Sequence, residues 1–337
     1  MTKQSNLTMI RFFRNSYLVQ YVLIVLLVLA LWIPSFITGN VNVTWRSAVT
    51  PLYNLIANIL DFWPPAMLLF AMLLMGFEAV FFNSMLSANQ IIGMVHTLGA
   101  VVFLLLLNLL PVQTTFYPFL VSSVFLLMFI HTLFAIYQSP RPELYLLNAG
   151  FYLSFATMCW FPSLVLAVWG IVSLSIIHKG SLRVHIIPFI GLLLPYFFYF
   201  GAHFLMGDLM PVLQGYADYF TGFRLSVGGF NWVRMAILGF LLLVSVIPWM
   251  SPLSYSFEKS VAVRTKITMT IVLLFFGIFL LFVEGDPMLH GVYFLALSIL
   301  FSYDLAYLDH LKWSNITFIL LILAVLASHY VPLFVAR

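Results

Sequence analysis

Apolar blocks about twenty residues long recur along this 337-residue chain. A helix needs about 20 residues to cross a hydrocarbon core of roughly 30 Å, so blocks of this length predict transmembrane helices. Only 7% of the residues are charged, whereas an average soluble domain has about 25%. The sequence therefore predicts an all-α, polytopic transmembrane helical bundle, with no polar stretch long enough for a separate soluble core.

The blocks predict eleven spans in a single integral membrane domain, residues 1–337. The expected spans are 17–38, 64–85, 91–110, 115–137, 143–160, 162–178, 184–206, 232–250, 265–283, 288–304 and 314–334. The fifth and sixth meet at "CWFPS", residues 159–163, and can form a tight helical hairpin. The stretch Pro51–Phe62 has helical periodicity but is too short to span, so we interpret it as an interfacial or re-entrant helix.

Charge predicts the orientation of these spans. With the N-terminus inside, the inner segments hold ten of the 14 Lys and Arg residues. The outer segments hold the other four, which are Arg46, Arg224, Arg234 and Arg337. The positive-inside rule therefore favours a cytoplasmic N-terminus and a C-terminus on the outer side.

One carboxylate, Glu78, interrupts the apolar run "MLLMGFEAVFFN", residues 72–83. Inserting an acid near a helix centre costs about 2.5–3.5 kcal/mol, which neighbours contributing about 0.3–0.6 kcal/mol each can offset. A carboxylate facing lipid is costly, so Glu78 is expected to face protein or a cavity. Counted from the predicted inner span ends, Glu78 lies roughly 12 Å deep, and His96 and His131 lie roughly 9 Å deep.

Short loops make consecutive spans neighbours. The common depth therefore predicts a buried polar layer of Glu78, His96 and His131, with Glu78 paired to one of the histidines. The three residues either satisfy one another in a packed bundle or form a proton relay or ion site. One Glu and two His could also complete a zinc ligand set, but no Glu-x-x-His or His-x-x-x-His spacing supports it. We therefore predict no metal site and no cofactor.

The predicted outer loops hold the other concentration of polar residues. Asp61 lies in the first outer loop, and Arg224 and Arg234 lie in the longest one. Arginines can hold a phosphate, and a carboxylate can take a proton from a hydroxyl. Ordinary solvated loop charges are the alternative. Further polar and aromatic residues of these loops are Trp45, Arg46, Trp63, Asp208, Tyr216, Asp218, Tyr219, Glu284, Asp286 and His290.

Three stretches carry a resemblance to a known family: "IRFFRNSYLVQYVLIVLLVLALWIPSF", "LNAGFYLSFATMCWFPSLVLAVWGIVSL" and "IIPFIGLLLPYFFYF". Together they resemble an uncharacterised family of polytopic inner-membrane proteins from Bacteroidota, over about the first two-thirds of the chain. The resemblance implies a multi-pass protein of the bacterial cytoplasmic (inner) membrane. It implies no activity.

The layout is also loosely similar to the polytopic glycosyltransferases that use lipid-phosphate sugar donors. The similarity lies in the outer amphipathic helix of the first loop and the short-looped spans after it. In that family the catalytic acid lies in the first outer loop, where this chain has only Asp61. The acidic pair that the family carries just after the first span is absent from "ITGNVNVTW", residues 37–45, so it stays open whether the chain is an enzyme.

Three functions follow as hypotheses. In the first, the protein handles a lipid-linked substrate at the outer face, with Asp61 as base and Arg224 and Arg234 as phosphate clamps. It is then a glycosyltransferase-like enzyme or a degenerate relative of one. In the second, it is a non-catalytic subunit or scaffold that docks other membrane proteins. In the third, it is a proton-coupled transporter that uses Glu78. Membrane lipids are partners in each case, and the lack of a basic run argues against nucleic acid.

Overall fold

The computed structural model of the chain describes twelve ranges of residues. These are 18–38, 45–92, 97–109, 115–137, 139, 141–177, 182–222, 260–281, 290–307, 318–319, 321–326 and 328–330. Every regular element within these ranges is a helix. The described part of the chain thus confirms the all-α fold class.

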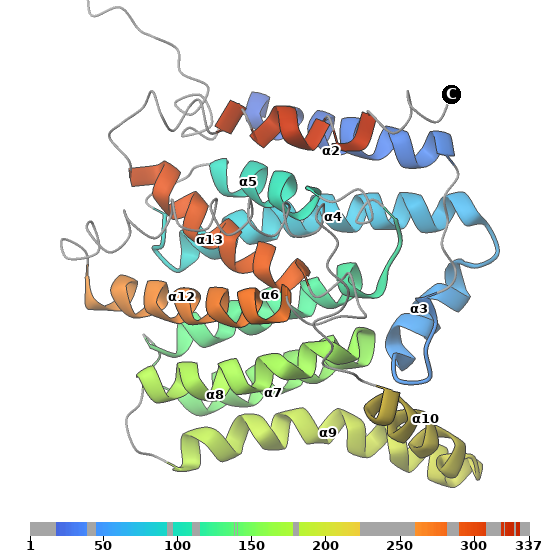
Figure 1. Ribbon diagram of the computed structural model, residues 1–337. Coiled ribbons are helices and arrows are strands. Elements are labelled where there is room, and N and C mark those ends of the chain that lie inside the picture. Colours follow the sequence, from blue (N-terminus) through green and yellow to red (C-terminus); the bar gives the residue numbers. More distant parts are fainter. Residues whose placement is uncertain are drawn as a thin grey trace, which may run out of the picture.

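The described residues form twelve named helices. Their order is α2 (Leu18–Thr38), α3 (Pro51–Leu60), α4 (Pro64–Ala88), α5 (Leu98–Leu107), α6 (Pro118–Ile136), α7 (Pro142–Cys159), η3 (Phe161–Val165), α8 (Leu166–Ile177), α9 (Leu182–Met206), α10 (Leu209–Gly222), α12 (Val261–Leu281) and α13 (His290–Tyr307). Most of them lie side by side along one direction, whereas α3 and α10 lie together at one end of the bundle (Figure 1).

Five of the described helices, α2, α4, α6, α9 and α12, are long and apolar enough to cross a membrane. Each falls on a predicted span. The span expected at 91–110 differs, because α5 has only ten residues and is therefore about 15 Å long, half of a hydrocarbon core. Every residue of α5 is buried, so protein rather than lipid surrounds this short helix. The span expected at 232–250 lies outside the described residues, and the one at 314–334 is described only in part.

The junction of α7 and α8 is more open than the tight hairpin that we expected from "CWFPS". Trp160 is extended, and the 3-10 helix η3 follows it with a proline in its first turn. Past this turn α8 packs mainly against α12, while α7 packs against α6 and α9. The Trp169 indole N–H donates to the Met269 carbonyl at 3.0 Å, which fixes α8 on α12. The turn therefore sends α8 to a different neighbour.

Two glycines allow α7 and α9 to touch through their backbones. A Cβ on Gly150 would collide with the Pro188 carbonyl oxygen, and a Cβ on Gly191 would collide with the Leu147 carbonyl oxygen. Small residues at a helix crossing are typical of membrane bundles, where close van der Waals packing drives association. The pair therefore sets the point at which α7 and α9 cross.

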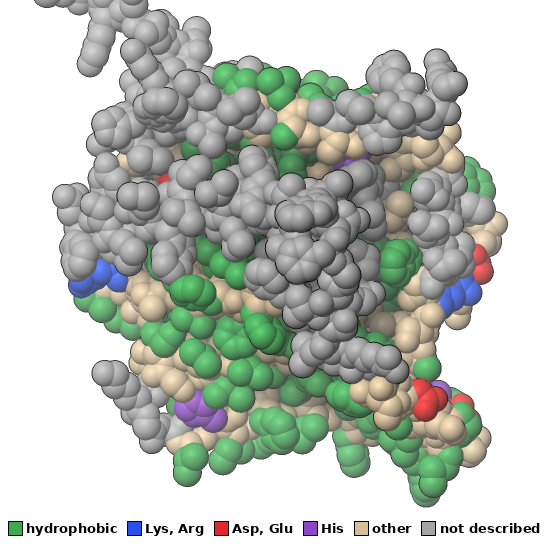
Figure 2. Space-filling model, in the orientation of Figure 1, with side chains coloured by type: hydrophobic (Ala, Val, Ile, Leu, Met, Phe, Trp, Pro, Cys, Tyr) green, Lys and Arg blue, Asp and Glu red, His purple; other side chains and the backbone are tan. Residues whose placement is uncertain are grey.

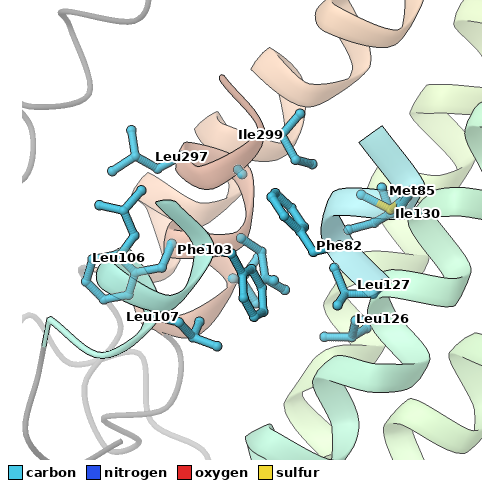
Figure 3. Packing of buried hydrophobic residues seen from close by; sticks show 14 of the residues in the cluster. Phe82, Met85, Phe103, Leu106, Leu107, Leu126, Leu127, Ile130, Leu297 and Ile299 are labelled. Carbon is cyan, nitrogen blue, oxygen red and sulfur yellow. The ribbon is translucent and has the colours of Figure 1, made fainter. Parts of the chain in front are cut away.

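The interior is filled where α4, α5, α6 and α13 meet. The rings of Phe82 and Phe103 stack there with centroids 4.8 Å apart, and leucine and isoleucine side chains of α6 and α13 surround them (Figure 3). Every residue of α13 from Gly291 to Leu305 is buried. A helix that is buried on all sides belongs to the centre of a bundle.

The surface separates charge from apolar side chains. On the face in Figure 2, the visible charged side chains lie near the left and right edges, where the helices of Figure 1 end, and hydrophobic side chains lie between them. On α9, Phe197 is 73% exposed and Phe198 is 65% exposed. Soluble monomers rarely expose apolar patches on this scale. The described surface is therefore that of a protein embedded in a membrane.

Candidate functional site

The short helix α3 presents a polar stripe beside an apolar anchor. Its apolar face buries Tyr53 and Ala57, and the Tyr53 hydroxyl donates to the Phe116 carbonyl at 3.2 Å. Asn54, Asn58 and Asp61 follow at intervals of four and three residues, so they share one flank of the helix, about 100° round from the buried face. The anchor holds α3 against the bundle. Asn58 of the stripe is exposed, whereas the Asn54 Nδ2 donates to the Ser47 carbonyl at 2.6 Å and its Oδ1 accepts from the Thr50 hydroxyl at 3.4 Å.

Asp61 forms an ion pair with Arg46 at the end of this stripe. The Arg46 Nη2 lies 2.8 Å from the Asp61 Oδ2, and the two side chains are 33% and 49% exposed. An exposed pair stabilises a fold by only about 0–1 kcal/mol. The main consequence of this pair is therefore that it holds a guanidinium and a carboxylate at the end of α3. From the sequence we predict that Arg46 lies in an outer loop, but we predict no function for it. The missed signal is that Arg46 and Asp61 flank one short amphipathic helix.

The two arginines predicted to clamp a phosphate, Arg224 and Arg234, lie outside the described residues. Their distance from Asp61 is therefore not part of the described geometry. Arg46 is the arginine that the described residues bring to Asp61.

A groove with a volume of about 860 Å³ lies between α3, α7 and α9. Most of its wall is apolar, and the stripe residues Asn54 and Asn58 form part of one side. The exposed side chains of Leu55 and Ile59 lie on its α3 side. Its lining residues are Pro51, Leu52, Asn54, Leu55, Asn58, Ile59, Phe151, Phe155, Met158, Leu194, Pro195, Phe198, Tyr199 and His203. The volume falls within the range of about 300–1,000 Å³ that is common for ligand pockets.

An imidazole–carboxylate pair lies at the edge of the groove. The His203 Nδ1 is 2.9 Å from the Asp208 Oδ1, and the His203 and Tyr199 rings have centroids 4.6 Å apart. Gly207 makes the turn between α9 and α10 with a φ of +81°, a left-handed conformation that glycine adopts without a Cβ penalty. This turn brings Asp208 back to His203.

The groove adjoins a group of residues that we call the end cluster, because Tyr199 lines the groove and also packs against this cluster. Val49, Phe161 and Tyr216 are its buried members, and the Phe161 ring has its centroid 5.4 Å from that of Tyr216. Burial raises the pKa of the Tyr216 phenol. A Cβ on Gly215 would lie 2.7 Å from the Ala48 side chain. The residues before α3, the turn η3 and the helices α9 and α10 therefore meet at one end of the bundle.

Glu78 lies in the filled interior, away from these exposed charges. Its side chain is 0% exposed, and its Oε1 lies 2.6 Å from the Ser123 Oγ of α6. Its Oε2 has no hydrogen-bond partner among the described residues.

His131 contacts a different residue, Asn89, at the end of α4. The Asn89 Nδ2 lies 2.8 Å from the His131 Nδ1 and 2.8 Å from the Met85 carbonyl oxygen. A carbonyl can only accept, which fixes the Asn89 amide and makes the His131 Nδ1 an acceptor. The buried Lys266 of α12 donates to the Asn89 carbonyl at 2.9 Å. A cation at this position also suits the negative end of the α4 dipole.

The structure does not bring Glu78 and His131 into one layer. Their partners on the facing helix, Ser123 and Asn89, show that the two residues lie roughly 12–16 Å apart along the bundle. The expectation relied on predicted span ends, and α4 continues to Ala88, three residues past the predicted end. Glu78 is therefore deeper than we expected. His96 lies outside the described residues.

Comparison with known proteins finds no matching family model, no matching curated protein and no matching solved structure. The chemistry of the site therefore has to come from its geometry. An apolar groove accepts a hydrocarbon chain, and the Asn58 amide and the His203 imidazole that line it can hydrogen-bond a phosphate or a sugar. The Arg46 guanidinium pairs with Asp61, three residues after Asn58. The described residues hold no group of three or more His, Cys, Asp or Glu side chains that could bind a metal ion.

Proposed function

We propose that this protein binds a lipid-linked substrate, an apolar chain joined to an anionic phosphate head group, at the outer face of a bacterial inner membrane. The observation that carries the proposal is the groove between α3, α7 and α9, whose apolar wall is bordered by the polar stripe of α3. The chain of the substrate would lie along Phe151, Phe155 and Leu194. Its head group would lie at the stripe, near Asn58 and Arg46.

The proposal includes the topology of eleven crossings with the N-terminus inside, in which the short helix α5 lies on the third crossing. In that topology the first outer loop, the α7–α8 turn and the longest outer loop all lie on one side of the membrane. These three segments contribute to the end cluster, which supports the proposal. A phosphatase fusion, active only outside, should be active after Arg337 and inactive at Lys259. The opposite result at either position would reject this topology.

A glycosyltransferase-like reaction would use Asp61 as the base. Asp61 would take the proton of an acceptor hydroxyl while that hydroxyl attacks the sugar, and the lipid phosphate would leave. Arg46 holds the Asp61 carboxylate at 2.8 Å, so a substrate phosphate would first have to draw the guanidinium away. Arg224 and Arg234 remain the proposed phosphate clamps. A degenerate relative would bind the same lipid without this reaction.

A second candidate function is that of a non-catalytic subunit. A groove of about 410 Å³ between α2 and α4 favours it, because this groove is apolar and a Cβ on Gly76 within it would meet no atom within 4 Å. A helix of a partner membrane protein would fit such a surface. Proton-coupled transport is less favoured, because Glu78 lines neither of these grooves among the described residues.

Native mass spectrometry of the protein purified in native lipid tests the proposal. Leu194→Trp fills the groove and should remove a co-purifying anionic lipid, whereas Leu193→Trp is the control on the same helix. Leu193 is 49% exposed and does not line the groove. Equal lipid retention in the two variants would reject the groove as the binding site.

The same measurement tests the head-group contacts. Arg46→Ala should weaken lipid retention, and so should the Arg224→Ala, Arg234→Ala double variant if those arginines clamp a phosphate. Arg183→Ala is the control, because Arg183 is an exposed arginine at the other end of α9, 3.8 Å from Glu143. Unchanged retention in the double variant would reject the clamp while leaving the groove intact as a proposal.

A further inference from the structure

The Ser123 hydroxyl lies between two oxygen atoms inside the bundle. Its Oγ is 2.6 Å from the Glu78 Oε1 and 2.7 Å from the Leu120 carbonyl oxygen. Both distances are typical of O–H···O hydrogen bonds. Two hydrogens are therefore needed between three oxygen atoms.

The proton count decides which group supplies the second hydrogen. A serine hydroxyl has one hydrogen, and a backbone carbonyl has none. If Glu78 were ionised, Ser123 could satisfy only one of the two contacts, and the other would bring two bare oxygen atoms within 2.7 Å of each other. If Glu78 is protonated, its O–H donates to Ser123, and Ser123 donates to Leu120. Only the protonated acid fills both contacts.

Burial gives an independent reason for the same protonation state. Glu78 is 0% exposed, and none of the ion pairs of the described residues involves it. A carboxylate that is buried and not paired with a cation is so costly that such a group neutralises instead. The neighbouring Tyr117 hydroxyl is also buried and has no hydrogen-bond partner among the described residues.

We propose that Glu78 is a proton-binding site that stays filled, so that the side chain is a neutral carboxylic acid in the folded protein. The acid donates to Ser123, and Ser123 passes a second hydrogen bond to the Leu120 carbonyl. This directed chain joins the middle of α4 to the first turns of α6. The bound ligand is a proton, and none of the ion pairs among the described residues involves this carboxyl group.

Infrared difference spectroscopy of the full-length protein in lipid tests this proposal. The wild-type spectrum minus that of Glu78→Gln should contain the carbonyl band of a protonated carboxylic acid, unchanged from mildly acidic to mildly alkaline pH. Glu143→Gln is the matched control, since Glu143 is half-exposed and lies beside Arg183. That control should remove the bands of an ionised carboxylate. A carboxylate band lost with Glu78→Gln would overturn the proposal.

Two variants extend the test. Glu78→Gln keeps a hydrogen donor for Ser123, so it should fold and keep a melting temperature close to the wild type. Failure of this variant to fold would count against a neutral acid. Ser123→Ala removes the acceptor of the acid, so the Glu78 carbonyl band should shift to the position of a non-bonded acid. An unshifted band would show that the acid does not donate to Ser123.

Discussion

Two carboxyl groups of this protein lie in opposite environments. Asp61 is paired with Arg46 at the surface, and Glu78 contacts Ser123 in the interior. The Asp61 carboxylate is 49% exposed and has a guanidinium partner. The Glu78 carboxyl is 0% exposed and has a hydroxyl partner. Water can replace either member of the exposed pair, so its charges are available to a ligand. No such exchange is open to the buried acid, which therefore contributes to the fold.

The two carboxyl groups also differ in the packing around them. Asp61 ends the polar stripe beside a groove of about 860 Å³, whereas Glu78 lies in the filled region of α4, α5, α6 and α13. We infer that changes near the groove should alter ligand binding and that changes near Glu78 should alter stability.

The largest stability effect is expected from the filled region. Phe82→Ala removes a fully buried ring stacked on Phe103 and should destabilise the fold by about 3–5 kcal/mol. Phe197→Ala is the matched control, because Phe197 is 73% exposed on α9 and should change stability by less than about 0.5 kcal/mol. Thermal unfolding in detergent measures both. Similar losses would remove the distinction between filled and open regions.

The next effect concerns the α7–α9 crossing. Gly150→Ala places a methyl group against the Pro188 carbonyl and should destabilise the fold by about 1–3 kcal/mol. A methyl group on Gly201, also on α9, meets nothing within 4 Å. Gly201→Ala should therefore be neutral or stabilise by up to about 1 kcal/mol, because alanine favours the helix. If the two variants melt alike, the backbones do not touch at Gly150.

A smaller effect separates the partners of Glu78. Double-mutant cycles on thermal unfolding should give a coupling of about 0.6–1.7 kcal/mol between Glu78→Ala and Ser123→Ala, as for other hydrogen bonds between membrane helices. Glu78→Ala and His131→Ala should add within about 0.5 kcal/mol, because the residues share no contact. Coupling to His131 alone would restore the layer that the sequence predicts.

The smallest stability effect is expected at the exposed pair. Arg46→Ala should cost at most about 1 kcal/mol, and Asp61→Ala should cost a similar amount. Lipid retention in native mass spectrometry should nevertheless fall in Arg46→Ala. A large loss of stability in either variant would mean that the pair holds α3 in place, contrary to the comparison drawn above.

The length and spacing of apolar blocks predicted most of the described helices. They did not predict the short length of α5, because apolar composition reports burial but does not distinguish burial in lipid from burial in protein. All ten residues of α5 are buried, and their sequence is as apolar as that of a longer span. Only the surrounding helices reveal the difference.

The polar contacts were harder to predict than the helices. A shift of three residues in the end of α4 moves Glu78 by roughly 5 Å, which accounts for only part of the roughly 12 Å along α6 between His131 and Ser123. A serine in an apolar helix gives no sequence signal of its own, because it can hydrogen-bond the carbonyl three or four residues earlier. The pairing of Arg46 with Asp61 depends in turn on how α3 docks through Tyr53, which residue spacing alone does not specify.

The contact of Gly150 with Gly191 is a pivot point, which we call the fulcrum, for the two helix segments that extend beyond it, which we call the arms. From it α7 continues to Cys159 and α9 continues past His203, and the groove opens between these arms. A smaller hollow of about 220 Å³ lies at the crossing itself and is lined by Gly150, Leu153 and Pro188, among other residues. A small rotation of α9 on α7 about this fulcrum is magnified with distance along the arms. The separation of the α7 and α9 walls of the groove therefore depends on the contact between two residues that lack side chains.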